Sequence, residues 1–218
     1  MDAAFQLLGT VGWSGTSVRA VCQEARLNPR YFYESFDDLD ALVIAVYDRV
    51  VEELAAVVLA ALDSASPDPA AQLRATLEAT VGFVDDDRRR SRVLYVEALG
   101  NEALNRRRID TGHAVATFVQ DFAKDRDGPP PEGEPIGAVA ASILVGGLSE
   151  LIVAWIEGRV ETSREQLIDD ATTLFLALGE AAAAVAANRP ATRRNARSSS
   201  GSGRPAPARR TRKATGRR

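Results

Sequence analysis

Hydrophobic residues recur at intervals of three and four positions along most of this chain. Such spacing gathers them on one side of a helix, whereas a half-buried strand would alternate apolar and polar residues. No alternation of that kind extends over five residues or more. The pattern predicts an all-α fold of about nine helices, over residues 2–11, 17–24, 28–34, 38–63, 70–84, 88–95, 97–125, 136–158 and 163–187.

Glycine and proline divide this pattern into regions. GWSG at 12–15 separates the first two helices, and SASPDP at 64–69 ends the long fourth helix, because proline cannot continue it. DRDGPPPEGEP at 125–135 is the clearest interior loop. Beyond residue 187 too few apolar side chains remain to offset the entropy cost of ordering the chain. We expect a helical head at 1–48, a helical body at 49–187 and a disordered arginine-rich tail at 188–218.

The formal charge is divided unevenly between these regions. All 30 acidic residues lie at or before Glu180, whereas residues 189–218 hold 11 basic residues and no acid. The remaining 16 basic residues leave the rest of the chain at about −14, although the whole chain has a net charge of only −3. Such asymmetry calls for separate interpretations of the two parts, and a basic tail suits phosphate groups.

The head contains two short helices joined by a tight turn. Thr16 stands where the helix over 17–24 should have its N-cap, since its hydroxyl can accept a bond from a free backbone N–H. The inward face of this helix is expected to consist of Val18, Val21, Cys22 and Ala25. In the next helix Asn28 can serve as the cap, and Pro29 fits the first position, where no backbone donor is needed.

Aromatic residues crowd this next helix, in LNPRYFYESF at 27–36. Phe32 and Phe36 are four positions apart and are expected to point into the core. The polar and aromatic side chains that lie on other faces, near the helix start, are Arg30, Tyr31 and Tyr33. Two short helices of this kind form a helix-turn-helix at about 17–36, the motif that places its second helix in the major groove of DNA. From spacing alone, a core corner with surface tyrosines remains the alternative.

The chemistry of these side chains suits DNA. Arg30 can donate a bidentate pair to guanine, and Tyr31 can contact a thymine methyl group or bond to a base edge. The hydroxyls of Tyr33, Thr16 and Ser17 suit phosphate oxygens, which fix the register without carrying sequence information. We therefore predict that this surface reads a DNA sequence.

Residues 3–48, AAFQLLGTVGWSGTSVRAVCQEARLNPRYFYESFDDLDALVIAVYD, resemble the N-terminal DNA-binding domain of the tetracycline-repressor (TetR) family. The resemblance includes the first helix, the turn at Gly12, TSVRAV at 16–21, YFYESF at 31–36 and the start of the long fourth helix. It covers only about a fifth of the chain. The body is similar to the family in helical layout and length alone.

The resemblance implies a homodimeric, ligand-responsive transcriptional regulator, usually a repressor, that binds a pseudo-palindromic operator in double-stranded DNA. The family's DNA contacts correspond by position to Ser17, Arg19, Asn28, Pro29, Arg30, Tyr31, Tyr33 and Ser35. One departure lies at the start of the fourth helix, where the family often has a phosphate-binding lysine and this chain has Leu39 among aspartates. The basic tail could compensate for that loss.

The last two helices of the body are candidates for the dimer interface. The helix over 136–158 is long enough to span a membrane, but Glu150 and two serines interrupt it. We expect it instead to be buried on several sides within a soluble bundle. The helix over 163–187 carries an apolar stripe that ends in small residues. Copies of both helices could pair about a two-fold axis, as in the resembled family; a monomer with these helices folded inward is the alternative.

Aromatic residues from four body helices are candidates for an effector pocket: Phe83, Tyr95, Phe118, Phe122 and Trp155. Ligand sites in helical bundles are lined by such side chains together with a few polar groups, and the resembled family places its effector site in this domain. The candidate polar anchors are Tyr95, Glu97, Asn101 and His113. An apolar lining predicts a small hydrophobic effector, while ordinary core packing is the alternative for each aromatic residue taken singly.

Little in the sequence suggests catalysis or a cofactor. His113 is the only histidine and has no nucleophile pattern around it, and the single cysteine, Cys22, excludes an internal disulfide. We predict no enzymatic activity, no metal site and no cofactor. The charge run DDDRRR at 85–90 is most simply a solvated turn. With no signal peptide evident at its start, the chain is expected in the cytoplasm.

The basic tail supports a second functional interpretation. Its positive charges can engage phosphates through counterion release, without reading sequence. In that case the protein would be an architectural or nonspecific nucleic-acid-binding protein. A solubilising appendage with no dedicated role is a further alternative for the tail.

Overall fold

The computed structural model describes residues 1–127 and 135–188, which contain nine α-helices and no strand. The helices are α1 (Asp2–Thr10), α2 (Val18–Glu24), α3 (Pro29–Tyr33), α4 (Leu39–Ser64), α5 (Pro69–Asp86), α6 (Arg88–Ser91), α7 (Glu102–Asp127), α8 (Ile136–Ile156) and α9 (Arg164–Asn188). The predicted all-α fold is therefore confirmed. The predicted disordered tail and most of the predicted 125–135 loop lie outside the described residues.

The start of α2 differs from the prediction by one residue. The Oγ atom of Ser17 accepts the backbone N–H of Ala20 (3.1 Å) and thereby caps the helix. The predicted cap at Thr16 is wrong, because the preceding 3₁₀ turn η1 (Trp13–Gly15) folds Thr16 inward. There its hydroxyl donates to the carbonyl oxygen of Gly12 at 2.8 Å.

The sequence predicts two helices that are nearly continuous from 88 to 125, and here the structure differs. After α6 the backbone widens into a π-helical turn, η2 (Arg92–Val96), and then tightens into a 3₁₀ turn, η3 (Glu97–Gly100). Asn101 follows, and its Oδ1 atom accepts the N–H of Leu104 (2.7 Å) at the start of α7. Turns of the π type are rare, and they often mark functional sites.

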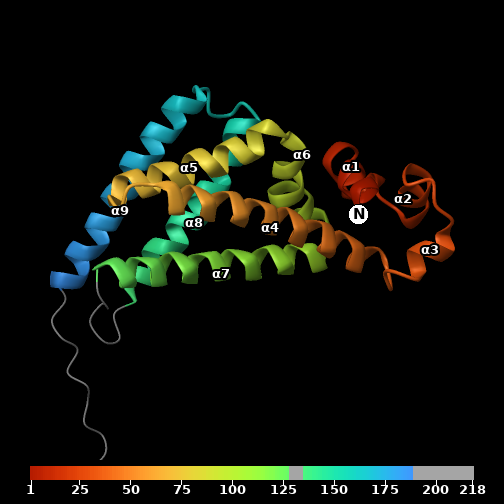
Figure 1. The fold of residues 1–218 in the computed structure, drawn as a ribbon, viewed down its shortest axis with the longest axis horizontal. Helices are drawn as coiled ribbons and strands as arrows, with labels where there is room; N and C mark the ends of the chain where they lie inside the picture. Colours follow the sequence, from red (N-terminus) through yellow and green to blue (C-terminus); the bar gives the residue numbers. More distant parts are fainter. Residues whose placement is uncertain (128–134, 189–218) are drawn as a thin grey trace, which may run out of the picture. The chain divides into compact units, whose positions relative to one another are not determined.

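The helix α4 links the head to the body, since it starts beside α3 and then runs along α5 and α7 (Figure 1). The first helix, α1, packs against α2, α4, α6 and η2. In the body α5 packs against α9, and α7 packs against α8. The head is therefore supported both by α4 and by the segment that follows α5.

Two apolar clusters hold these helices together. The larger joins the head to the body and includes Leu8 of α1, Phe32 of α3, Val46 of α4 and Val93 of η2. The smaller joins α5 to α9 and includes Ile168. Full burial of one such side chain contributes roughly 1.5–3 kcal/mol, so the larger cluster fixes the head's inner side on the body.

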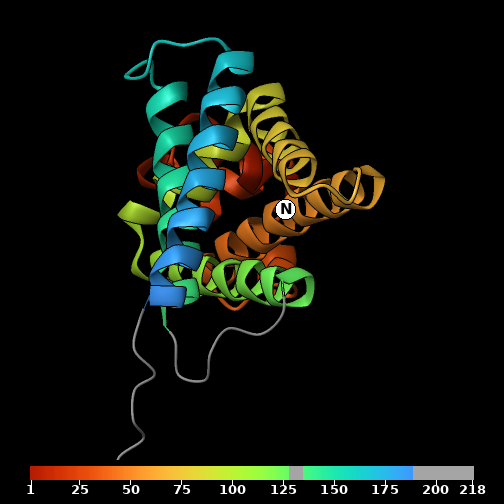
Figure 2. The same ribbon diagram turned by 90° about the vertical axis from the view of Figure 1, so that its left-hand side faces the viewer.

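The helices α8 and α9 lie side by side (Figure 2). Most of their apolar side chains are exposed or only partly buried. On α8 only Ala141 and Ile152 are buried, while Ile143 is 53% exposed; on α9 Leu174 is 66% exposed. The expectation that α8 is buried on several sides is therefore wrong for a single copy of the chain. Both helices are long and apolar enough to cross a membrane, which is weak evidence when only two helices meet that test.

Candidate nucleic-acid interface

The helices α2 and α3 meet at a tight turn that the backbone itself closes. The N–H of Leu27 donates to the carbonyl oxygen of Cys22 (2.9 Å), and Arg26 adopts a φ of +55°, uncommon for a residue with a side chain. The Oδ1 atom of Asn28 then accepts the N–H of Arg30 (2.9 Å), with proline at the first helical position, as predicted. The predicted helix-turn-helix is therefore confirmed.

The short helix α3 divides its side chains between the core and the solvent. Phe32 is only 6% exposed and contacts the rings of Tyr33 and Phe36, with centroid distances of 5.1 and 5.9 Å. By contrast, Tyr31 and Tyr33 are 57% and 61% exposed, and the side chain of Arg30 is 83% exposed. The packing that α3 needs is thus confined to one side, and the other side is free to contact a ligand.

The remaining predicted DNA contacts belong to the same two helices and their ends. Those exposed to solvent are Ser17, Arg19, Asn28, Pro29 and Ser35. Thr16 is the exception, because it is 6% exposed and its hydroxyl already donates to Gly12. The helix-turn-helix therefore presents eight of the nine predicted side chains to solvent.

The charges beside α3 are mixed. Arg30 forms an exposed ion pair with Glu34 at 3.0 Å. Such a pair contributes at most about 1 kcal/mol, because water screens it, so the guanidinium can exchange Glu34 for a base or a phosphate. Asp38 accepts the N–H of Ala41 (2.8 Å) and caps α4. The acidic residues after α3 therefore stabilise the start of α4 rather than attract DNA.

A second polar cluster lies where the head meets η2 and η3. Glu97, which is 7% exposed, accepts the backbone N–H of Trp13 (2.6 Å) and two N–H groups of Arg92 (3.0 and 2.5 Å). Asn101, also 7% exposed, donates from Nδ2 to the carboxylate of Asp40 at 2.7 Å. Glu97 and Asn101 were predicted as polar anchors of an effector pocket, and the structure places them against the head instead. A single sequence carries no signal that pairs residues 84 and 61 positions apart.

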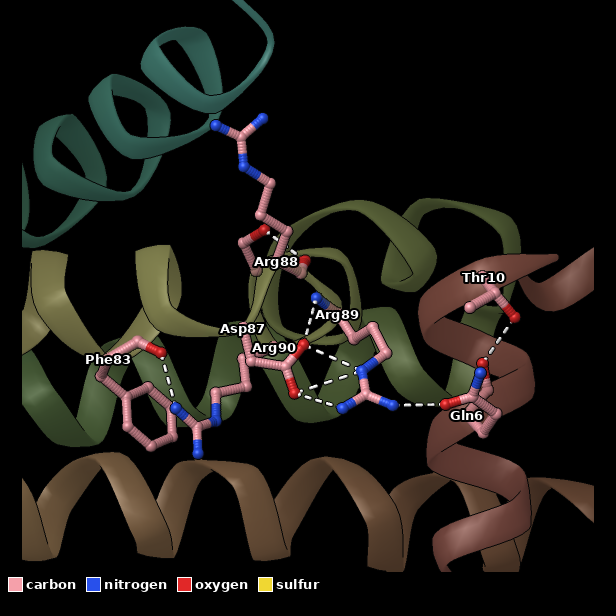
Figure 3. Close-up of polar contacts among 8 residues, drawn as sticks. Gln6, Thr10, Phe83, Asp87, Arg88, Arg89 and Arg90 are labelled. Carbon is pink, nitrogen blue, oxygen red and sulfur yellow. Dashed lines mark hydrogen bonds and ion pairs between the residues drawn. The ribbon is translucent and has the colours of Figure 1, made fainter.

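The charge run at 85–90 is more than the solvated turn that the sequence suggests. The carboxylate of Asp87 accepts from the guanidinium of Arg89 at 2.7 Å, and Arg89 also donates to Gln6 of α1 (Figure 3). Arg88 points away from this group (Figure 3). The hydrogen bonds from Arg89 lower the pKa of Asp87 below its usual value. The run therefore fastens α6 to the head.

The five aromatic residues predicted to line an effector pocket lie in three separate places. Phe83 and Tyr95 belong to the larger core cluster, where burial raises the pKa of the Tyr95 phenol. Phe118 and Phe122 stack on each other on α7 at 6.2 Å, and Phe118 is 47% exposed. Trp155 packs against the smaller cluster. The structure therefore does not bring the five rings together.

Two recesses lie elsewhere on the protein. The larger, of about 860 Å³, is formed by α1, α2, α3 and α4, with Phe5 and Phe36 beside the charged Arg49 and Asp87. The smaller, of about 420 Å³, lies between η2 and the end of α8, beside Val96. None of the five predicted aromatic residues lines either recess. These two recesses are therefore distinct from the predicted effector pocket, which stays a prediction.

The sequence profile of the family described as "Bacterial regulatory proteins, tetR family" matches residues 1–46. This stretch contains α1, the helix-turn-helix and the start of α4. Residues 1–46 are a TetR-family DNA-binding domain. The match confirms the resemblance noted at 3–48, and it makes the helix-turn-helix a DNA-binding element. No curated protein matches the chain in sequence.

Solved structures share the fold of this protein over its body as well as its head. The fatty acid degradation regulator FadR from Bacillus halodurans is 15% identical, with a TM-score of 0.67 over 80% of this chain and 91% of that one. A transcriptional regulator from Rhodococcus sp. Rha1 is 19% identical, with a TM-score of 0.65 over 83% and 94%. The multidrug binding protein EbrR, in complex with imidazole, is 22% identical, with a TM-score of 0.58 over 79% and 90%. At these identities the similarity concerns the fold alone.

Proposed function

We propose that this TetR-family regulator is a homodimeric, cytoplasmic repressor that reads a pseudo-palindromic operator and is released from it by a small hydrophobic effector. The observation that carries the proposal is the division of α3. Its buried Phe32 fixes the helix, while Arg30, Tyr31 and Tyr33 stand in solvent at its start. In a helix-turn-helix, those N-terminal residues are the ones that contact base edges.

Each exposed side chain has a distinct task in this proposal. Arg30 donates a bidentate pair to guanine, and Tyr31 contacts a thymine methyl group or bonds to a base edge. Ser17, Arg19 and Tyr33 bind phosphate oxygens and fix the register of the head on the duplex. Ser17 and Asn28 already cap their helices, and the helix N-termini that they mark attract phosphate through their free N–H groups.

The exposed faces of α8 and α9 support the dimer. Side chains such as Ile143 and Leu174 are left in solvent by a single chain, and contiguous apolar surface of this kind marks an interface. A second copy is a better cover than lipid, because Glu150 lies within α8 with 77% of its side chain exposed, and an acid within a bilayer is costly. Closed two-fold pairing would hold two heads for the two half-sites of a palindrome.

Release by an effector follows from the course of α4. This helix leaves the head and runs between α5 and α7, so a molecule bound among the body helices would shift α4 and alter the spacing of the two heads. A ligand can do this only through different affinities for the two arrangements. The multidrug binding protein EbrR, with imidazole bound, shows that a protein of this fold binds a small organic molecule.

Selection of bound fragments from a random DNA pool tests the proposal directly. We expect a motif with two-fold symmetry, whose half-sites are separated by about 34–36 Å, one helical turn of DNA. Recovery of fragments without a common motif would contradict sequence reading. Recovery of a motif with a single half-site would contradict the dimer.

An architectural protein that binds through the basic tail is the second candidate. The observation that favours it is the composition of residues 189–218, with 11 basic residues and no acid. Deletion of these residues should lower the salt dependence of binding but leave the selected motif intact if the head reads the DNA. If specific binding instead disappears with the tail, while Arg30→Ala and Tyr31→Ala change nothing, the architectural role is correct.

A further inference from the structure

The helix-turn-helix is held at both of its ends by one short turn of the body. Trp13 lies just before α2, and Asp40 lies just after α3, at the start of α4. Trp13 is hydrogen-bonded to Glu97, the first residue of η3, and Asp40 is hydrogen-bonded to Asn101, the residue that follows η3. The segment between Trp13 and Asp40 is therefore fixed to two residues that are only four positions apart.

The contact at the entry to the helix-turn-helix is partly buried and closely fitted. The N–H of Trp13 donates to the Oε2 atom of Glu97 at 2.6 Å, and Arg92 donates to the other oxygen. Gly12 has a φ of +81°, and it lets the Glu97 carboxylate lie close to the backbone before Trp13. A Cβ atom at position 12 would lie 2.8 Å from that carboxylate. A Cβ atom on Gly100 would lie 3.3 Å from the Trp13 ring, so the ring rests directly on η3.

The contact at the exit uses both ends of one amide. The Nδ2 atom of Asn101 donates to Asp40 at 2.7 Å, while its Oδ1 atom accepts the N–H of Leu104 and caps α7. Further along, Arg107 of α7 forms two hydrogen bonds with Asp48 of α4, at 2.6 and 2.9 Å. A displacement of the start of α7 would therefore move Asp40 and the exit of the helix-turn-helix with it.

We propose that the turn 97–101 is a positioning element that sets the orientation of the helix-turn-helix on the body. It acts through Glu97 at the entry and Asn101 at the exit. Glu97 and Asn101 are each only 7% exposed, and hydrogen bonds from such sites favour a single arrangement, because little water competes for them. The π and 3₁₀ turns before Asn101 differ from an α-helix in hydrogen-bond register, so this segment is not a continuation of α7. The consequence for DNA binding rests on the proposed function; the positioning of the head does not.

The exit contact can be broken without loss of the helix cap. Asn101→Asp keeps an oxygen to accept the N–H of Leu104, since aspartate is a good cap, but it turns a carboxylate toward Asp40. The added Asp40→Asn substitution then restores one amide and one carboxylate with their places exchanged. Asp40→Ala removes the contact without repulsion and leaves Asp38, the cap of α4, untouched. Glu102→Gln, which loses only an exposed pair with Arg106, is the matched control.

Two measurements on the full chain test the proposal. In the free protein, hydrogen exchange of the amides between residues 13 and 41 should be faster in Asn101→Asp and Asp40→Ala. The exchange rate should return to that of the parent protein in the double variant Asn101→Asp/Asp40→Asn, and it should stay unchanged in Glu102→Gln. Affinity for the DNA fragment recovered from the random pool should fall on the order of tenfold in Asn101→Asp. It should recover in the double variant Asn101→Asp/Asp40→Asn, because substitutions at two residues in contact are not additive.

The outcomes separate this proposal from the proposed function. The turn does not position the head if hydrogen exchange is unchanged in Asn101→Asp and Asp40→Ala. The same conclusion holds if the double variant Asn101→Asp/Asp40→Asn fails to restore the parent exchange rate. If exchange responds as expected while no fragment is recovered from random DNA, the positioning element stands and the proposed function fails.

Discussion

The helix-turn-helix and the exposed faces of α8 and α9 both leave large side chains in solvent, but of different kinds. In the head the exposed rings of Tyr31 and Tyr33 carry hydroxyls and stand beside Arg30. On α8 and α9 the exposed side chains include Ile143 and Leu174, which have no hydrogen-bonding atom. A surface with polar groups can remain hydrated until a partner arrives, whereas an aliphatic surface gains stability only when it is covered. Under the proposed function, the first is a recognition surface that contacts DNA, and the second is an assembly surface that pairs two copies of the chain.

The largest expected effect comes from a charge on the assembly surface. Leu174→Glu should give a monomer, because an unpaired carboxylate cannot be buried between two copies. Two linked heads bind jointly, so affinity for the selected DNA should fall by about 10²–10⁴-fold. Sedimentation velocity and fluorescence anisotropy measure the two effects. The control Leu59→Glu, at a residue of α4 that is 50% exposed, should remain dimeric. A Leu174→Glu dimer with full affinity would exclude this face from the interface.

The next effect separates the two sides of α3. Phe32→Ala should lower the free energy of unfolding by about 3–5 kcal/mol, because it leaves a cavity in the core. Tyr31→Ala removes a similar ring from the solvent side and should change the free energy of unfolding by no more than about 0.5 kcal/mol. Urea unfolding of the two variants makes the comparison. Equal losses would mean that the outer side of α3 also carries packing.

A smaller effect is expected from the recognition surface itself. Arg30→Ala should cost about 1–3 kcal/mol of binding to the selected DNA and relax the base preference at one position of each half-site. Stability should not change, since Arg30 has only an exposed pair with Glu34 to lose. Arg106→Ala, at an arginine whose side chain is 74% exposed on α7, serves as the control. An unaltered motif after Arg30→Ala would show that the base contact lies elsewhere.

The cap of α2 should have an effect of about 1 kcal/mol. Ser17→Ala removes the acceptor of the Ala20 N–H and should lower the free energy of unfolding by about 0.5–2 kcal/mol. Ser14→Ala, at an exposed position of the preceding turn, should be neutral. Chemical denaturation of the DNA-free protein gives both values, and equal stability of the two variants would mean that the cap contributes nothing.

The smallest effect concerns pH and the contact of α6 with the head. Hydrogen bonds from Arg89 lower the pKa of Asp87 in the folded protein. The ionised Asp87 therefore contributes its full stabilisation at any pH above its unfolded-state pKa of about 3.9. This stabilisation is lost as the pH falls through the folded-state pKa. Asp87→Asn should therefore destabilise the protein at neutral pH. The variant should then lose less stability than the parent protein when the pH is lowered. Urea unfolding at several pH values measures this, with Asp86→Asn as the control. An identical acid response in the parent and Asp87→Asn would contradict it.

Local patterns were sufficient to predict the helices and the orientation of α3. Phe32 and Phe36 are four positions apart, and their rings lie close together although α3 ends at Tyr33. Asn28 with Pro29 marks a helix start without reference to distant residues. The cap of α2 was misplaced by one position because Thr16 and Ser17 both offer a hydroxyl. Only the fold of η1 decides between them.

Features that depend on distant residues could not be predicted. The break after α6 coincides with a hydrogen bond between Glu97 and Trp13, which are 84 positions apart. The exposure of α8 depends on how few helices of one chain cover it. The aromatic residues proposed for a pocket, such as Phe118 and Trp155, were grouped by type rather than by place, and packing separates them.

The attachment of α3 by a single buried ring has a consequence for redesign. Phe32 is the only residue of α3 that is buried. The side chains of Arg30 and Tyr31 can therefore be exchanged together, like the variable loops of a binding scaffold, without repacking the interior, whereas the ring of Tyr33 contacts that of Phe32 at 5.1 Å and should be kept. Under the proposed function, new DNA preferences should be attainable by varying these two positions while stability changes little.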